Sequence, residues 1–197
     1  LGVGSSCPAG VRKKGGGPVP ARKLLDYVRL LPDADITIKF QENQWASIQC
    51  GRSRSRIAGM SKKSYPELPR MPEPLAAIPV GALSSMIGKT IFAISMEESR
   101  FTLNGALLIL KHEGLTMVAS DGHRLALVEK PLELNGVSGS YRALLPRKAM
   151  SELLKMAGEA DADMPLAFSG DDNHLFFRLG DRLLLSRKLT GNFPDFE

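Results

Sequence analysis

Apolar residues in the first sixty positions follow a helical period and then an alternating one. Leucine and valine side chains recur at helix spacing after a proline suited to a first turn, which predicts a helix over 20–31. Alternating segments separated by polar turns then predict strands at 36–40, 45–50 and 52–60. Residues 61–74 contain four prolines and many charges, so we interpret them as a linker between two domains.

The rest of the chain repeats this arrangement. Apolar faces at helix spacing predict helices over 80–89 and 146–156. Short apolar or alternating segments between polar turns predict strands. We place them at 75–79, 107–110, 115–119, 124–129, 141–145, 165–168, 174–179 and 182–186. The order of the elements indicates an α+β fold with antiparallel sheets.

Four landmarks recur in the same order in the two parts of the chain. Pro20 and Pro146 each open a basic helix, and a strand, a turn and a second strand lead to Gly51 and Gly180. The distance between proline and glycine is 31 positions in the first part and 34 in the second. An aromatic-proline-acidic sequence then follows each glycine. We infer a duplicated unit of one helix and three strands.

Basic residues are concentrated in the first part. Residues 1–70 contain 13 Lys and Arg against 5 Asp and Glu, a net +8, and residues 71–197 contain 13 against 16, a net −3, which together give +5. A basic region is typical of a protein with an acidic partner, most often nucleic acid, although basic solvated surfaces are also common.

The composition restricts the class of protein. A chain of 197 residues, 43% of them hydrophobic, can bury one large core or two small ones. No apolar run approaches the roughly 20 residues of a membrane span, and residues 1–14 lack the charge order of a signal peptide. Cys7 and Cys50 are too few for a disulfide scaffold or a zinc site. We therefore expect a cytoplasmic protein without a membrane partner, a metal or a cofactor.

Three short motifs resemble catalytic or ligand-binding sequences but lack the required context. Residues 120–123 place a serine, an aspartate and a histidine on one turn, whereas a nucleophilic triad converges from separate segments. Residues 88–90, Gly-Lys-Thr, end a helix and lack the earlier glycine of a phosphate-binding loop. The acidic residues and histidine at 171–174 fit the polar tip of a hairpin better than a metal site. We predict that the chain is not an enzyme.

Six longer motifs are more distinctive. They are VPARKLL at 19–25, GRSR at 51–54, FTLNG at 101–105, SDGHRLA at 120–126, LPRK at 145–148 and SRKLTGNFPDF at 186–196. Together they resemble the bacterial beta sliding clamps, the processivity subunits of DNA polymerase III. That family has three similar domains per chain, and two chains form a ring. The resemblance implies that residues 1–70 are the C-terminal half of the first clamp domain and residues 71–197 the middle domain. The third domain is absent, so we expect a fragment.

The resemblance also implies that helices line a central hole for duplex DNA. Helices can present Lys and Arg to phosphates without reading bases. The candidate DNA-binding residues lie on three predicted helices and on one loop, where Glu97 and Glu98 would repel phosphate. They are Arg22, Lys23, Arg29, Lys89, Arg147 and Lys148 on the helices, and Arg100 and Phe101 on the loop.

A second implied surface is a pocket in which polymerases and other partners dock a short apolar peptide. The matching positions are Leu103, Ser120, Gly122, His123, Arg124, Leu125 and Pro194. Apolar walls accept side chains, while a tight Asp121-Gly122 turn exposes backbone groups. A plain hairpin turn is the alternative from the residues alone. Because the pocket's other wall is expected beyond Glu197, we expect weak peptide binding.

The third implied surface is the ring interface. The strand at 52–60 matches an exposed sheet edge of the first clamp domain, with Arg52, Arg54 and Ile57 as interface residues, or it is a charged edge that prevents aggregation. We therefore expect a clamp that encircles double-stranded DNA. Short peptide motifs would tether DNA polymerase III and clamp-loader subunits, and the full-length ring would be a homodimer. The alternative is a free-standing protein-interaction module that does not encircle DNA.

Overall fold

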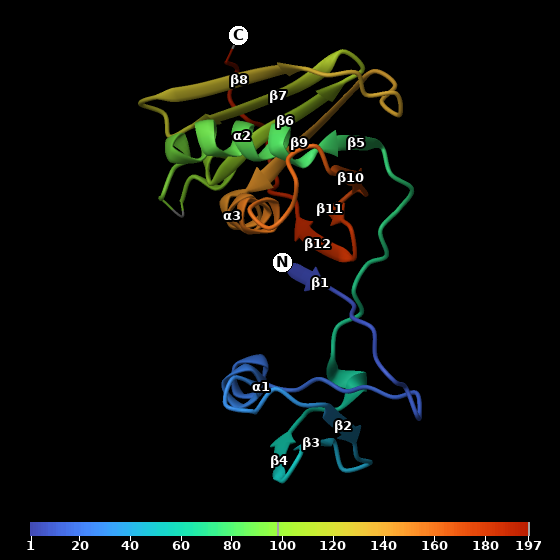
Figure 1. The fold of residues 1–197 in the computed structure, drawn as a ribbon. Coiled ribbons are helices and arrows are strands. Elements are labelled where there is room, and N and C mark those ends of the chain that lie inside the picture. Colours follow the sequence, from blue (N-terminus) through green and yellow to red (C-terminus); the bar gives the residue numbers. More distant parts are fainter. Residues whose placement is uncertain (98, 197) are drawn as a thin grey trace. The chain divides into compact units, whose positions relative to one another are not determined.

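The computed structural model of the chain describes residues 1–97 and 99–196. These residues form two compact units, which are drawn in Figure 1. The smaller unit spans Pro8–Pro69, and the larger unit contains Leu1–Cys7 and Arg70–Glu197. None of the helices in the described residues is long and apolar enough to span a membrane.

The smaller unit contains one helix and one antiparallel sheet of strand order β2-β3-β4. Its elements are α1 (Ala21–Val28), β2 (Ile36–Phe40), β3 (Trp45–Cys50), β4 (Ser53–Ala58) and the short 3-10 helix η1 (Lys62–Ser64). All three predicted strands are confirmed. The helix ends before the predicted residue 31, because the amides of Leu30 and Leu31 bond to carbonyls three residues back and tighten the last turn.

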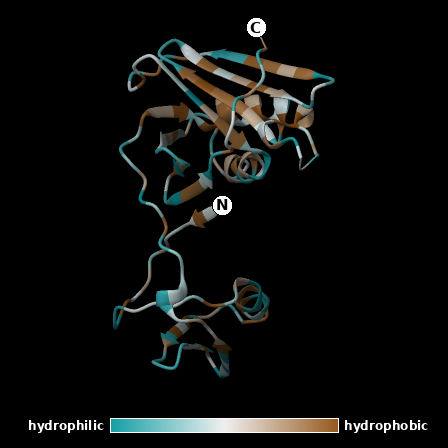
Figure 2. Cartoon of the chain, turned by 180° about the vertical axis from the view of Figure 1, so that it is seen from behind, coloured by the Kyte–Doolittle hydropathy of each residue, from teal (hydrophilic) through white to brown (hydrophobic). Residues whose placement is uncertain are grey.

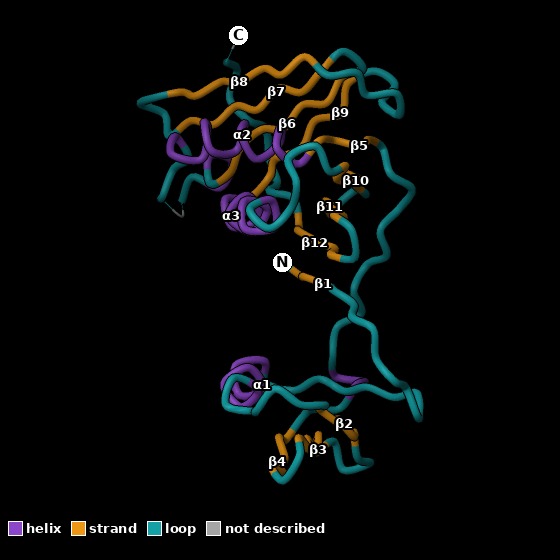
Figure 3. The backbone as a smooth tube through the Cα atoms, in the orientation of Figure 1, coloured by secondary structure: helices purple, strands orange, loops and turns teal. Residues whose placement is uncertain are grey.

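The larger unit contains two antiparallel sheets and two helices, shown as a tube in Figure 3. The four-stranded sheet has the order β8-β7-β6-β9, and the five-stranded sheet has the order β1-β12-β11-β10-β5. The strands are β1 (Gly2–Gly4), β5 (Ala76–Pro79), β6 (Gly105–Lys111), β7 (Gly114–Ser120), β8 (Leu125–Pro131), β9 (Ser140–Pro146), β10 (Pro165–Gly170), β11 (His174–Leu179) and β12 (Arg182–Arg187). The helices are α2 (Val80–Thr90) and α3 (Arg147–Ala157), with short 3-10 helices η2 (Ile91–Ala93) and η3 (Phe101–Leu103).

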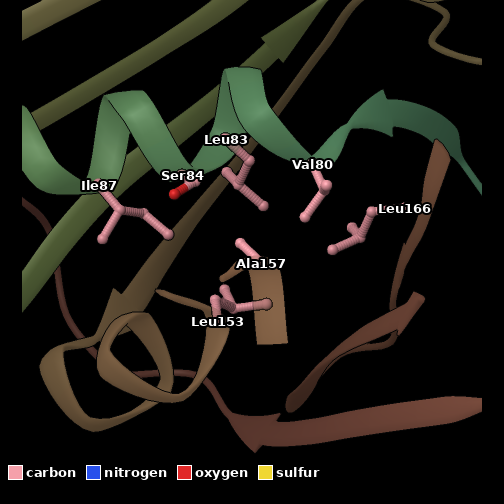
Figure 4. A pocket seen from close by; sticks show the side chains of 7 residues that line it. All are labelled: Val80, Leu83, Ser84, Ile87, Leu153, Ala157 and Leu166. Atoms are coloured by element: carbon pink, nitrogen blue, oxygen red, sulfur yellow. The ribbon is translucent and has the colours of Figure 1, made fainter. Parts of the chain in front are cut away.

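One core holds the larger unit together. It joins the inner faces of both sheets with one face of each helix, and Figure 2 shows hydrophobic residues along these strands and helices. In Figure 4, Leu83 and Ile87 of α2 face Leu153 of α3, and Leu166 of β10 lies nearby. The crevice between them has no space for a water molecule. Such close packing makes the unit a rigid support for the loops at its surface.

The larger unit is built from two equivalent halves. Each half contains a strand, a helix and three further strands: β5-α2-β6-β7-β8 in the first and β9-α3-β10-β11-β12 in the second. The first strand of each half pairs with the other half, β5 with β10 and β9 with β6. The smaller unit repeats the order of helix and three strands seen in α3 to β12. The duplication predicted from the sequence is therefore present in the structure.

One strand was not predicted. Residues 2–4 form β1, and Val3 lies opposite Leu184 on β12. Residues 1–7 therefore belong to the larger unit, whereas the sequence placed everything before residue 71 in one domain. A strand of Gly-Val-Gly has neither the length nor the alternation by which strands are predicted.

Candidate peptide-binding turn and basic helix ends

The turn between β7 and β8 is fixed by its own side chains. Oδ1 of Asp121 accepts hydrogen bonds from the amides of His123 and Arg124, both at 3.0 Å. The Ser120 hydroxyl donates to the Arg124 carbonyl at 2.8 Å and accepts from the Gly122 amide at 3.1 Å. Gly122 has a φ of +89°, a conformation that favours glycine. The predicted turn is thus an Asx-type turn, which the side chains of Ser120 and Asp121 close by bonding to its own backbone.

Arg100 ties this turn to the loop that carries Leu103. Nη1 of Arg100 donates to the Asp121 carbonyl at 2.9 Å, and Nε donates to Glu97 at 2.9 Å. A Cβ atom on Gly122 would lie 2.7 Å from the Arg100 Nη1 atom, so the glycine provides the room for the guanidinium. The backbone of Leu103 bonds in turn to the carbonyl of Arg100. Two segments of the predicted pocket are held together in this way.

Arg124 links the same turn to η2, the short 3-10 helix that follows α2. Its Nε donates to Asp121 at 2.9 Å, and Nη2 donates to the carbonyl of Phe92 at 2.8 Å. The guanidinium carbon lies 5.6 Å from the centre of the Phe92 ring, within the range of a cation–π contact. Phe92 itself is exposed. Sequence analysis did not identify it, because nothing in the motif around residue 92 distinguishes it from an ordinary apolar residue after a helix.

Exposed and buried apolar groups surround the turn. Leu103 is buried, whereas Leu125 is 49% exposed and Leu127 on the same face of β8 is 43% exposed. On the outer face of the sheet, Phe193 and Phe196 of the C-terminal segment pack against a small cluster that includes Val118. Val118 lies opposite Leu127 in the sheet. Pro194 is exposed between the two phenylalanines. An apolar surface therefore extends along β8 beside exposed backbone of the turn.

Hydrogen bonds from the amides of His123 and Arg124 lower the pKa of the Asp121 carboxyl below its ordinary value of 3.8. Because the pKa of Asp121 is lower in the folded chain than in the unfolded chain, its ionised carboxylate stabilises the folded turn at pH values above the unfolded-state pKa. This stabilisation is lost as the pH falls through the folded-state pKa. We therefore expect the amide NMR shifts of His123 and Arg124 to stay constant from about pH 5 through the ordinary aspartate range and to change only in stronger acid. A change in these amide shifts with a midpoint at or above pH 3.8 contradicts the expectation.

Three of the predicted DNA-binding residues lie at one end of the helix pair in the larger unit. Nη1 of Arg147, at the start of α3, donates to the carbonyl of Ile91, just after α2, at 3.3 Å. The end of α2 and the start of α3 are therefore adjacent. Lys89 and Lys148 are exposed at this end. Their ammonium groups are available to an anion, whereas part of the Arg147 guanidinium is engaged within the protein.

The loop residues predicted to bind DNA have different surroundings. Phe101 is exposed on η3. The Arg100 guanidinium is directed to the 120–125 turn by the bonds described above, so it belongs structurally with the peptide-pocket residues. Glu98, one of the two glutamates expected to repel phosphate, lies outside the described residues, and Glu97 forms the ion pair with Arg100.

The smaller unit carries the other candidates. Arg22 and Lys23 on α1 and Arg29 at its end are exposed. β4 lies at an edge of the sheet, and Arg52 and Arg54 are exposed, while Ile57 is buried on the core side. Ile57, which was predicted at the ring interface, is therefore covered by the unit's own core, and exposed arginines are what this edge presents to a partner.

The acidic residues at 171–174 form the predicted hairpin tip. Oδ1 of Asp171 accepts from the amides of Asn173 and His174 at 2.8 and 2.6 Å. The carboxylate also contacts Nδ1 of His174 at 3.1 Å. Within residues 1–97 and 99–196, no group of three or more His, Cys, Asp or Glu side chains is arranged to hold a metal ion. Asp171 thus serves to close the turn between β10 and β11.

Family models match both units. The model of the DNA polymerase III beta subunit central domain matches residues 77–195, and that of the N-terminal domain matches residues 5–69. The chain belongs to the DNA polymerase III beta subunit family. It is 34% identical over 190 residues to the beta sliding clamp of Chlamydia muridarum, covering 95% of this chain and 50% of that protein. The Synechocystis sp. clamp is 32% identical over 216 residues, covering 100% and 55%.

Solved clamp structures share the fold. The DNA polymerase III beta subunit from Pseudomonas aeruginosa superposes with a TM-score of 0.82 at 31% identity, covering 90% of this chain and 48% of that chain. A sliding clamp from Bartonella birtlesii, bound to griselimycin, gives a TM-score of 0.86 at 33% identity, with coverage of 98% and 52%. The α+β clamp fold expected from the sequence is confirmed. The chain spans about half the length of these relatives, and its family membership supports a non-catalytic subunit.

Proposed function

We propose that this beta-clamp chain acts as a sliding clamp, a processivity factor that encircles double-stranded DNA and tethers the replicative polymerase. The observation that carries the proposal is the 120–125 turn, held to the Leu103 loop by Arg100 in a chain of this family. We assign residues 1–70 to the C-terminal half of the first clamp domain and residues 71–197 to the middle domain, although residues 1–7 and Arg70 pack with the larger unit. The matched family ranges, 5–69 and 77–195, support that assignment.

DNA contacts are proposed for the basic helix residues, with Lys89 and Lys148 as the main contacts in the larger unit. Both are exposed ammonium groups at one end of the α2–α3 pair. Point charges on helices attract phosphates without fixing a base sequence, which suits a protein that must move along DNA. The β4 edge, with Arg52 and Arg54, is proposed to extend its sheet to a neighbouring clamp subunit in a homodimeric ring.

The apolar surface beside the turn is proposed to bind a short peptide of DNA polymerase III or of a clamp-loader subunit. Leu125 and Leu127 offer exposed apolar side chains, and the backbone of residues 122–124 orients the ligand. His123 is exposed on the turn and can donate or accept a hydrogen bond. The bond from Arg124 to the Phe92 carbonyl keeps this side of the turn in place.

Peptide binding tests this function directly. A fluorescein-labelled six-residue peptide with leucine and phenylalanine side chains is titrated with the 197-residue chain, and anisotropy gives the dissociation constant. We expect Leu125→Ser to weaken binding about tenfold, since burying a leucine contributes on the order of 1.5–3 kcal/mol. Leu68→Ser removes an equally exposed leucine from the smaller unit and is expected to leave binding unchanged. Equal affinities for the two variants overturn the assignment of the pocket.

A further inference from the structure

The loop 132–139, which joins β8 to β9 (Figure 1), contains an asparagine followed by a glycine. The sequence has two such pairs, Asn104-Gly105 and Asn135-Gly136. In an Asn-Gly pair the backbone nitrogen of the glycine can attack the side-chain amide of the asparagine, because glycine has no Cβ atom to obstruct the approach. The fold decides whether either pair can react, since it holds the two reacting groups in different ways.

The pair in the loop is free to react. Asn135 and Gly136 are the central residues of a β-turn, in which the amide of Val137 donates to the carbonyl of Leu134 at 3.1 Å. Both central residues are exposed. Within residues 1–97 and 99–196, neither the Asn135 side chain nor the Gly136 amide has a hydrogen-bond partner. No hydrogen bond therefore has to break before the glycine nitrogen approaches the asparagine side chain.

The other pair is held by the fold. With its side-chain nitrogen toward two carbonyls, Asn104 donates to Ser95 at 3.3 Å and to Glu97 at 2.9 Å. Gly105 is buried at the start of β6, where it lies opposite Pro146. Attack by the Gly105 nitrogen would break both bonds and draw the glycine out of the sheet. This pair can react only after the region opens locally.

The structure also explains why the exposed pair keeps its glycine. A Cβ atom at position 136 would collide with the carbonyl of Leu75, the residue before β5. On either side of the pair, Leu134 and Val137 belong to the core of the larger unit. The turn is thus fixed at both ends and packed against Leu75. A change in the length of its backbone will be felt at these contacts.

We propose that Asn135-Gly136 is a site of spontaneous deamidation, and that the conversion loosens the loop 132–139 from Leu75. The Gly136 nitrogen forms a bond to Cγ of Asn135, and the side-chain nitrogen leaves as ammonia with the proton that the Gly136 amide loses. Water then opens the resulting succinimide ring to an aspartyl or an isoaspartyl residue. Water is the only co-reactant, and nothing is oxidised or reduced.

Both products change the loop. Each adds a negative charge two residues from Glu133. The isoaspartyl product also adds one methylene group to the main chain between Leu134 and Val137. A longer backbone cannot keep both buried ends, the turn hydrogen bond and the close approach to Leu75. The proposal concerns the larger unit alone and does not depend on the proposed clamp function.

Mass spectrometry of tryptic peptides tests the site. Peptides 125–142 and 101–111 each contain a single asparagine, Asn135 and Asn104. The folded chain and the two free synthetic peptides are incubated at neutral and at mildly alkaline pH. In the folded chain we expect peptide 125–142 to deamidate nearly as fast as its free form, and about tenfold faster for each pH unit as the attacking amide ionises. Peptide 101–111 is expected to react more than about tenfold slower than its free form.

Two asparagine variants supply the control. Asn135→Ser removes the amide that is attacked, and we expect it to abolish the mass increment in peptide 125–142. Asn43→Ser removes another exposed asparagine, which precedes Gln44, and is expected to leave that increment unchanged. A folded chain that preserves Asn135 while the free peptide converts overturns the proposal. Equal protection of Asn135 and Asn104 in the folded chain also overturns it.

Hydrogen exchange tests the loosening. After ion exchange separates the deamidated chain, the Val137 amide is expected to exchange at least about tenfold faster, because its bond to Leu134 is lost. The His123 amide is expected to be unchanged, since its turn lies at the other end of β7 and β8 from Pro131. Unchanged exchange at Val137 overturns this part of the proposal. None of these results alters the peptide titration with Leu125→Ser, so the clamp function is judged separately.

Discussion

Replacing Lys89 and Lys148 together with glutamate is expected to weaken binding of a short DNA duplex by about a thousandfold at low salt. The two ammonium groups are exposed at one end of the α2–α3 pair. Each reversal removes one attraction to phosphate and adds one repulsion, and each such term is on the order of 1 kcal/mol in water. The slope of log affinity against log salt falls by about two, because two phosphates are no longer neutralised.

A control with the same change of net charge separates local contact from the overall field of the protein. Lys111 and Lys130 are exposed in the larger unit, near the turn that joins β6 and β7. The double variant Lys111→Glu, Lys130→Glu is expected to weaken DNA binding several-fold. The slope of log affinity against log salt is expected to stay close to that of the unmodified chain. Equal losses in the two double variants show that the helix end is not a specific contact. A chain that binds the peptide but no duplex supports the alternative of an interaction module.

The secondary structure was largely predictable because its signals are local. Pro20 and Pro146 open basic helices at the predicted places, and Trp45–Cys50 forms a strand with the bounds that its alternation indicates. The duplication was detectable for the same reason, since glycine and proline landmarks are set by backbone requirements. Strand β1 was missed because its pairing with β12 joins residues that are far apart in the chain. No local pattern encodes such a contact.

The candidate site was predictable as a set of residues but not as a geometry. The motif at 120–126 located the turn, and the Asp-Gly pair predicted its tightness. It did not show that Arg100 donates to the Asp121 carbonyl, nor that Arg124 reaches the carbonyl of Phe92. These bonds connect positions 21 and 32 residues apart in the sequence. A basic loop residue therefore resembled a phosphate ligand in the sequence, although its guanidinium bonds within the protein.

Phe168→Ala is expected to destabilise the larger unit by about 3–5 kcal/mol, the largest effect of any single substitution proposed for this chain. Phe168 is fully buried. Its ring lies 5.2 Å from the ring of Phe177 and 5.6 Å from that of Tyr141, measured between centroids. Truncation removes these contacts and leaves a cavity that the two sheets and two helices cannot fill without moving.

Urea unfolding followed by circular dichroism measures this loss, which is a large part of the roughly 5–15 kcal/mol typical of a whole domain. Phe92→Ala is the matched control, because it makes the same substitution at an exposed ring and is expected to cost under about 1 kcal/mol. A similar midpoint for the two variants means that the aromatic cluster does not hold the sheets together. A selective loss in Phe168→Ala shows instead that the burial of this ring against Phe177 and Tyr141 stabilises the larger unit.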